Sequence, residues 1–477
     1  MTQINGGIDN FRREKGNMNE TFEIFGYWWT PENEENQEPG ILYFSQDEGI
    51  VLELFSKEHL PLPIDLGEIN IILGISEDGK EISLYKCFVK NKKSNLFHGL
   101  SKTVYHAHIL FIGVHFFTVD DIKFSTLSGS FSNLRGWVNI SGFKNEYSFE
   151  DYDFTRSTTH YFKPETKLIK LTEKVNAAVG LSYFESNQIT ISSTIKSMEE
   201  TPEVLISCSE GELSFFSLNK YLNSFADLLQ LASQRKVYAL KIFGVSERKE
   251  PKGENRKIRV SIFYQPIEPF KQLRTQTPSD YLFLYKDLNE QMIINWFEKN
   301  DDFSTELNLY QTLFYTDRLF IETRFTNIVT ALESLHSQLF DNIFMDSNQF
   351  IKQRDEVIES APKEYEDWLS KDIFSNANYK RFRQKILELL ECKGTLFSGL
   401  IEDKEAFARA TRDTRNELIH QSEQSNSFPK EDRIWAIFIL RYVFEAYILE
   451  LIGFSQEKIS QMYTMRIKQY LTFGKCL

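Results

Sequence analysis

The period of the apolar pattern changes near residue 285, and this change constrains the fold more than any other feature of the chain. Before it, short apolar runs are separated by Pro, Gly and Asn, which is typical of antiparallel strands joined by turns. After it, apolar residues recur at spacings of three and four, the period of one face of an α-helix. The clearest stripe is Ile321, Phe325, Ile328, Leu332, Leu335 and Leu339. The sequence therefore predicts an α+β protein with a strand-rich first part and an all-α second part.

The strand-rich part is expected to form antiparallel β-sandwich or barrel-like subdomains. A helical pattern at 217–233 interrupts the strands, and the polar segment 247–257 is expected to be a hairpin tip or a disordered connection. The expected strands are 21–29, 40–44, 49–54, 69–75, 104–117, 136–140, 189–195, 204–206 and 237–245.

The second part is expected to be a bundle of helices, which includes segments 379–390 and 404–420. A chain of 477 residues is long enough for several domains, each with its own core. The expected domains are residues 1–155, 156–284 and 285–477.

Composition limits the class of protein. With 41% hydrophobic residues the chain is typical of globular proteins, and its net charge of −13 argues against non-specific coating of nucleic acid while leaving room for a local basic groove. The four cysteines form no CxxC pair, which favours a reducing compartment. The first residues contain no apolar core of the signal-peptide type, and the apolar run 434–454 contains Arg441, Glu445 and Glu450. We therefore expect a cytoplasmic protein without a membrane span.

The segment 411–420, Thr-Arg-Asp-Thr-Arg-Asn-Glu-Leu-Ile-His, carries the main chemical signal. It places a guanidinium (Arg415), an amide (Asn416) and an imidazole (His420) within six positions. In an α-helix Asn416 and His420 share a face, whereas Arg415 lies roughly 140° from His420 by the 3.6-residue period. Three arrangements bring Arg415 and His420 to one atom: a wrapped arginine, a distorted helix, or a second copy of the chain across a two-fold axis.

These residue types suit RNA cleavage without a metal ion. The ribose 2′-hydroxyl must lose a proton and attack the adjacent phosphate, the 5′-oxygen must gain a proton, and the charge of the phosphorane must be balanced. Histidine transfers protons near neutral pH, arginine matches phosphate oxygens, and an amide orients either group. The expected products are a 2′,3′-cyclic phosphate and a 5′-hydroxyl. The competing interpretation is that Arg415, Asn416 and His420 are ordinary surface residues.

Basic residues gather in the same helical part of an otherwise acidic chain. A local basic pocket steers a polyanion to one place, and a solvated helix face is the alternative interpretation. Glu333, beside the apolar stripe, is either a partner that holds Arg415 or Arg412 or an exposed helix glutamate. The candidate RNA-binding residues are Arg409, Arg412, Lys380, Arg381 and Arg383.

Other candidate sites carry weaker signals. His106 and His108 share a face of an expected strand, but the sequence supplies no convincing third ligand, so structural histidines are favoured over a zinc site. Four aromatic residues are either core residues or platforms on which bases stack: Tyr27, Trp28, Trp29 and Trp137. The absence of a glycine-rich phosphate loop and of a Gly-x-Ser-x-Gly motif argues against an NTPase or a serine hydrolase. We expect no metal and no cofactor.

Arg415-Asn416 followed by His420 resembles the Arg-polar-x-x-x-His motif of the HEPN superfamily of ribonuclease domains. The helices expected at 320–340 and 433–454 resemble the long first helix and the closing helix of that superfamily. The first half is similar to that of the ApeA-like bacterial anti-phage proteins. The segments that carry this similarity are 25–29 (Phe-Gly-Tyr-Trp-Trp), 40–44 (Gly-Ile-Leu-Tyr-Phe), 52–54 (Leu-Glu-Leu) and 113–116 (Gly-Val-His-Phe).

The resemblance implies a metal-independent endoribonuclease that acts as a homodimer or higher even oligomer, in which Arg415, Asn416 and His420 of two copies form one cleft. It also implies abortive defence against phage, with tRNA anticodon loops as the substrate and a phage-derived trigger. The motif is complete in this chain. Two alternatives stay open: a non-catalytic sensor or adaptor that dimerises through its helical domain, and a ligand-gated sensor of a small molecule.

Overall fold

The chain consists of a strand-rich unit, Met1–Leu288, and a helical unit, Asn289–Leu477. The expected boundary after residue 284 lies close to this division, and the one after residue 155 lies within strand β10 (Asp153–Tyr161), so the three-domain arrangement stays a prediction. The computed structural model describes residues 16–56, 68–94, 101–150, 153–189, 194–249, 255–271, 274–315, 319–394, 396, 399–420 and 426–473.

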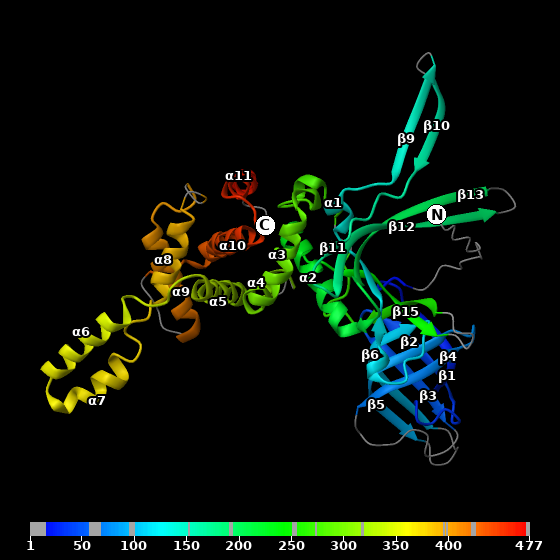
Figure 1. Cartoon of the computed structure of the whole chain (residues 1–477), viewed down its shortest axis with the longest axis horizontal. Helices are drawn as coiled ribbons and strands as arrows, with labels where there is room; N and C mark the ends of the chain where they lie inside the picture. Colours follow the sequence, from blue (N-terminus) through cyan, green and yellow to red (C-terminus); the bar gives the residue numbers. More distant parts are fainter. Residues whose placement is uncertain are drawn as a thin grey trace. The chain divides into compact units, whose positions relative to one another are not determined.

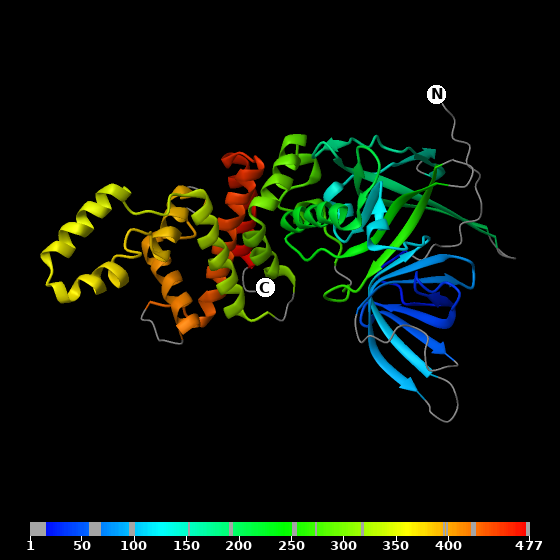
Figure 2. The same cartoon turned by 60° about the horizontal axis from the view of Figure 1, so that its bottom comes forward.

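The first strands close into an antiparallel barrel, which both views show at the blue end of the chain (Figures 1 and 2). Around the barrel the order is β1-β2-β3-β6-β5-β4, and β4 pairs again with β1. The expected fold class is confirmed, and this region adopts the barrel alternative. The strands are β1 (Phe22–Trp29), β2 (Glu38–Ser45), β3 (Gly49–Ser56), β4 (Ile69–Ser76), β5 (Glu81–Ser94) and β6 (Ser101–Ile112).

Alternating side chains fill the barrel, as the period of two requires. In β1, Phe22, Ile24 and Trp28 are buried, whereas Tyr27 between them is 54% exposed. Gly74 of β4 lies against the Trp28 ring, and a Cβ at this position would come within 2.3 Å of a ring carbon. The indole therefore occupies space that only a glycine leaves free. Trp28, Trp29 and Trp137 are all buried, so the core interpretation is confirmed for them, whereas it is wrong for the exposed Tyr27.

Beyond its pairing with β3, the end of β6 pairs with β16 on that edge while it stays paired with β5 on the other, and β16 begins an open antiparallel sheet. In this sheet the order is β16-β15-β8-β13-β12-β11, and helix α2 (Phe215–Ser233) packs against β8 and β13. The helix expected at 217–233 is thus confirmed. The strands are β8 (Thr126–Phe131), β11 (Ile169–Lys170), β12 (Val175–Ile189), β13 (Thr194–Cys208), β15 (Ala239–Lys249) and β16 (Asn255–Tyr264). Outside it, β9 (Phe143–Glu150) pairs with β10, and β7 (Lys123–Phe124) pairs with β14 (Leu213–Ser214).

Three local expectations need comment. The strand expected at 136–140 is wrong, because Leu134–Val138 forms the short helix α1, whose buried Trp137 ring packs edge-on against Phe225 of α2. The expected strand 189–195 is divided between the end of β12 and the start of β13, and residues 190–193 lie outside the described residues. The segment 247–257 is a hairpin of β15 and β16, whose tip at 250–254 also lies outside them.

The helical unit is built around α5, which packs against α4, α8, α9 and α10. The middle of its apolar stripe is buried as expected, since Phe325, Ile328, Leu332 and Leu335 are all inaccessible to solvent, whereas Ile321 and Leu339 at the two ends are partly exposed. The helices are α3 (Glu290–Asp302), α4 (Ser304–Tyr315), α5 (Ile321–Leu339), α6 (Ser347–Ser360), α7 (Glu366–Trp368), α8 (Phe382–Cys392), α9 (Lys404–His420), α10 (Lys430–Ile452) and α11 (Gln456–Phe473).

Helices α6 and α7 form an arm that extends away from α5 and α8 (Figure 1). Helix α6 buries no residue among those described. At the base of the arm an antiparallel bridge pairs Ile343 with Tyr379, so the chain enters and leaves the arm at one place. Tyr379 belongs to this bridge, and α8 therefore begins three residues later than the expected helix 379–390.

Candidate functional site

The motif Arg415-Asn416-x-x-x-His420 lies at the C-terminal end of α9, an uninterrupted helix with the bounds that the sequence predicted. Its inner face buries Phe407, Ala408, Thr411 and Thr414 against the rest of the unit. Arg412, Asn416 and His420 follow one another at intervals of four residues on the other side. The helix therefore presents its polar residues outward from a fixed apolar base.

Side chains of α9 also fix its last turns to the segment that leads into α10. The Asp413 carboxylate accepts a hydrogen bond from the Asn426 amide at 3.2 Å, and the Thr414 hydroxyl accepts one from the Phe428 backbone N–H at 2.8 Å. Arg433 donates to Glu417 at 2.7 Å. These contacts stabilise the C-terminal turns of α9, which carry the motif, although none of them involves the motif itself.

Arg415 is held between two other helices. Its Nη2 lies 3.4 Å from Glu333 Oε2 of α5, and its guanidinium lies over the ring of Phe382, the first residue of α8, at 5.0 Å. The Nε of Arg415 is buried without a hydrogen-bond partner among the described residues. An ion pair of 3.4 Å together with a cation–π contact orients the guanidinium while leaving N–H donors free.

His420 is the last residue of α9 and is exposed. Its imidazole makes no hydrogen bond or ion pair with any part of the chain that the structure describes. Because α9 is regular through this segment, Arg415 and His420 point in directions roughly 140° apart. A distorted helix is therefore excluded as the means of bringing them together.

Asn416 and Arg412 line a groove of about 510 Å³. The groove lies between α9, the start of α8 and the base of the α6–α7 arm. It combines aromatic rings with basic and amide groups, and neither Arg415 nor His420 belongs to its lining. Its lining residues are Phe344, Ala377, Tyr379, Arg381, Phe382, Arg383, Gln384, Arg412 and Asn416.

The candidate RNA-binding residues fall into two groups. Arg381, Arg383 and Arg412 line the groove, and Arg381 makes no ion pair within the described residues. Arg409 is on the exposed surface of α9, 4.0 Å from Glu405. Lys380, by contrast, donates to both oxygens of Glu388 at 2.8 and 3.0 Å, so its charge is already balanced. We leave Lys380 out of the contacts proposed for RNA.

Comparison with known proteins assigns both parts of the chain. The model of the ApeA N-terminal domain 1 matches residues 23–296, and that of the Apea-like HEPN domain matches residues 326–458. The chain belongs to the ApeA family. Neither curated proteins nor solved structures gave a significant match. The HEPN match includes α9 with the complete motif, and membership of the ApeA family supports a HEPN-type anti-phage protein.

In this ApeA-family chain the residues that sequence reasoning missed are the aromatic lining of the groove and a buried histidine. Phe344 and Tyr379 carry no sequence signal, because they lie far apart in the chain and meet only through the bridge at the base of the arm. His336 of α5 is fully buried, and its Nε2 lies 2.8 Å from Glu388 of α8. It continues the apolar stripe of α5, so its spacing is that of a core residue.

The link between His336 and Glu388 joins α5 to α8, the helices that carry the two partners of Arg415. Burial lowers the pKa of His336 more than its bond to Glu388 raises it, so the imidazole is neutral at neutral pH. Burial by itself would raise the pKa of Glu388, but hydrogen bonds from Lys380 and His336 outweigh it and hold that pKa below its ordinary value of 4.5. A neutral histidine and an ionised glutamate are therefore the stable pair.

Acidification is expected to weaken this link. A histidine with a pKa below its unfolded value of 6.5 stabilises the fold above that pH, and the contribution is lost as the pH falls, because the unfolded chain then binds the proton more readily. Between about pH 7.5 and about pH 5.5 the wild type should lose more thermal stability than His336→Gln, since the variant keeps the other seven histidines but lacks this buried one. Far-UV circular dichroism of the two proteins across this range measures the difference, and identical losses would contradict it.

The three histidines in and next to β6 contact structural partners, and two of them share the ring of Phe88. The His106 ring stacks on Phe88 at 5.6 Å, His108 meets Phe88 edge-on, and His115 Nε2 lies 2.7 Å from the Gly74 carbonyl. In the described parts of the chain, no three His, Cys, Asp or Glu side chains come together in a group able to hold a metal ion. Metal independence of any reaction stays a proposal.

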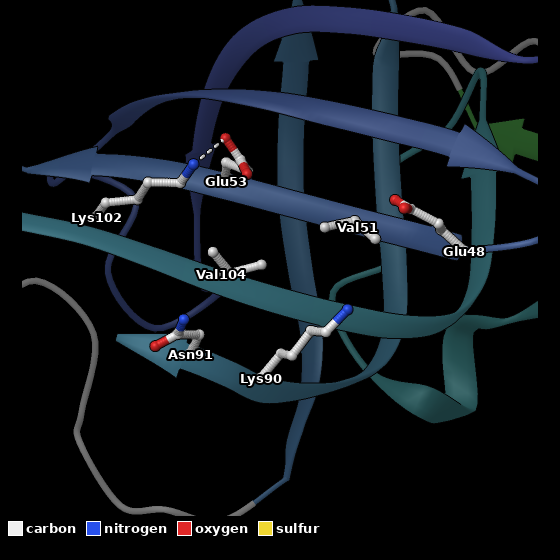
Figure 3. Close-up of a pocket in the computed structure, with 7 residues that line it drawn as sticks. All are labelled: Glu48, Val51, Glu53, Lys90, Asn91, Lys102 and Val104. Atoms are coloured by element: carbon white, nitrogen blue, oxygen red, sulfur yellow. Dashed lines mark ion pairs between the residues drawn. The ribbon is translucent and has the colours of Figure 1, made fainter. Parts of the chain in front are cut away.

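A second groove, of about 420 Å³, lies on the outer surface of the barrel (Figure 3). Glu53 and Lys102 form an ion pair of 2.6 Å there, and Glu48 and Lys90 lie further along it. Acidic and basic groups balance in this groove, so it has no net charge with which to select an anion such as RNA. None of the described helices combines the length and the apolar character that crossing a membrane requires.

Proposed function

We propose that this ApeA-family protein is an endoribonuclease that cleaves RNA without a metal ion in abortive defence against phage, with tRNA anticodon loops as its substrate. One observation carries the proposal. The complete motif Arg415-Asn416-His420 lies on a regular, well-anchored helix beside a groove lined by arginines and aromatic rings, within the residues that match the HEPN domain. Arginine-rich, aromatic surfaces are suited to RNA because they combine phosphate contacts with base stacking.

The chemistry assigns separate tasks to the two charged residues. His420 takes the proton of the 2′-hydroxyl as that oxygen attacks the phosphorus, or gives a proton to the departing 5′-oxygen. Arg415, whose side chain is 29% exposed, balances the charge of the phosphorane through the accessible donors that Glu333 does not use. The P–O5′ bond breaks as the P–O2′ bond forms, so the products are a 2′,3′-cyclic phosphate and a 5′-hydroxyl.

A homodimer would bring together an Arg415 and a His420, which a single copy of the chain holds apart. Arg415 and His420 diverge on one regular helix, and a two-fold axis beside α9 would place the Arg415 of one copy opposite the His420 of the other. The exposed position of His420 at the end of α9 is compatible with such a cleft.

The proposal is tested by incubating purified protein with tRNA in the presence of EDTA. We expect cleavage of single-stranded loops, with cyclic phosphate at the new 3′ ends by mass spectrometry. RNA that stays intact with the wild type in EDTA but is cut after Mg²⁺ is added would contradict metal independence. RNA that stays intact under both conditions, with a triggering phage lysate also present, would favour the alternative of a non-catalytic sensor or adaptor.

A further inference from the structure

The groove beside the motif contains exposed aromatic rings that the core does not use. Phe344 and Tyr379 are 59% and 56% exposed, although both line the groove. Within the described residues neither ring contacts another ring. A large apolar side chain that stays exposed in a concave surface lined with polar groups indicates a binding site rather than packing.

Both rings stand on a rigid frame. The Phe344 N–H donates to the Asn378 carbonyl at 2.6 Å, and the Lys380 N–H donates to the Asn342 carbonyl at 2.7 Å. The Asn378 side chain completes the frame, because its oxygen accepts from the Met345 N–H and its amide donates to the Met345 carbonyl, each at 3.0 Å. The aromatic surface is therefore preorganised, which lowers the entropic cost of stacking a ligand on it.

Amide groups face the same space. Asn416 lines the groove, and its side chain has no hydrogen-bond partner among the residues that the structure describes. Gln384 uses its oxygen to accept the Arg381 backbone N–H at 2.9 Å, which leaves its amide donors free. An asparagine amide offers a donor beside an acceptor, the pattern that pairs with the edge of a nucleobase.

The Arg381 guanidinium adds a positive charge to the aromatic and amide groups of the groove. Arg383 pairs with Glu405 and Arg412 with Asp413, whereas Arg381 is exposed and makes no ion pair in the described chain. A volume of about 510 Å³ falls in the range of pockets for small ligands, so a nucleotide enters where a duplex does not. The aromatic rings thus suit the face of a base, the Asn416 amide suits its edge, and the Arg381 guanidinium suits the phosphate of the same nucleotide.

We propose that this groove is a base-binding subsite for RNA, in which an unpaired nucleobase stacks on Tyr379 and Phe344 and Asn416 reads its edge. The inference rests on the proposed function and deepens it, because it gives Asn416 a role in choosing the nucleotide rather than in moving protons or charge. Arg381 holds the phosphate of the same nucleotide. The site is separate from Arg415 and His420, which lie outside the lining of the groove.

Binding to protein that cannot cleave tests the subsite directly. In the His420→Ala background, fluorescence anisotropy is measured with labelled RNA homopolymers of A, C and U of about twelve nucleotides, and with a duplex of the same length. We expect the homopolymers to differ in affinity and the duplex to bind more weakly than all of them. Tyr379→Ala should weaken single-strand binding about tenfold, whereas Tyr365→Ala, which removes an exposed ring of the arm outside the groove, should leave it unchanged.

The role of Asn416 is tested by the ratio of the affinities for the tightest and the weakest homopolymer. Asn416→Ala should reduce the difference between the tightest and the weakest homopolymer about tenfold, and the matched Asn348→Ala, an exposed amide of α6, should preserve it. Equal affinity for the three homopolymers, or a loss of equal size for each of them with Asn416→Ala, would overturn base reading. A free nucleotide that binds as tightly as the oligonucleotide would overturn the assignment to an RNA strand.

A cleavage series separates this inference from the proposed function. Substrates that differ only in the base beside the cleaved bond should be cut by the wild type at different rates, and Asn416→Ala should flatten the series. If the wild type cuts the substrates with A, C, G and U at this position equally fast, the base-binding subsite is refuted, and the proposed ribonuclease activity is supported. If it cuts none, the nuclease is refuted, and the binding series above still decides whether the groove reads a base.

Discussion

Replacing His420 with alanine is expected to lower the rate of RNA cleavage by about 100- to 10,000-fold, the usual contribution of a general acid or base. The imidazole is exposed and makes no hydrogen bond or ion pair within the described chain, so its removal should leave the fold and the groove unchanged. Single-turnover cleavage of a labelled tRNA measures the rate, and circular dichroism checks the fold. A variant that cleaves as fast as the wild type would remove His420 from the mechanism.

A mixture of two inactive proteins provides the control for a shared cleft. In a dimer whose sites each combine Arg415 of one copy with His420 of the other, a hybrid of Arg415→Ala and His420→Ala contains one intact site. Random exchange of subunits should then restore about a quarter of the wild-type activity. Activity that stays absent after exchange, although hybrid dimers form, would place both residues of each site on one chain.

Removing the carboxylate of Glu445 is expected to destabilise the helical unit by about 3–5 kcal/mol, the cost of leaving a buried charge without its partner. Glu445 of α10 is inaccessible to solvent. Its oxygens accept hydrogen bonds from Tyr310 of α4 at 2.7 Å and Tyr463 of α11 at 2.9 Å, and Arg441 Nε lies 3.2 Å away. Glu445→Ala breaks all three contacts, which join three helices.

Urea unfolding followed by far-UV circular dichroism measures the loss of stability. The matched control is Glu431→Ala, an exposed glutamate in the first turn of the same helix, for which we expect a change of about 0.5 kcal/mol. Equal losses for the two variants would show that the buried network contributes no more than an exposed charge.

The sequence predicted the long periodic elements well. Helix α9 has the expected bounds, and the middle of the stripe of α5 is buried, because 17 and 19 residues of consistent period leave little choice of face. The short apolar run at 136–140 was assigned to a strand, since five residues do not distinguish the two periods. The packing of Trp137 against α2 stabilises the helical conformation of α1 instead.

The candidate site was predictable only in part. The spacing of Arg415, Asn416 and His420 revealed the motif, and local charge pointed to Arg381 and Arg383. The groove itself was hidden, because its aromatic rings come from segments separated by the whole α6–α7 arm. No periodicity connects such residues; only the backbone bridge brings them together.

The bridge between Ile343 and Tyr379 also has a consequence for how proteins of this kind can diversify. The two chain segments that it pairs meet at the base of the arm, so the ends of the arm are already joined. The entropic cost of closing such a loop grows only slowly with its length. Insertions and deletions in α6 and α7 can therefore accumulate without moving Phe344 or Tyr379. In the helical unit, the α6–α7 arm, which tolerates changes of length, therefore lies directly beside the groove residues, which do not.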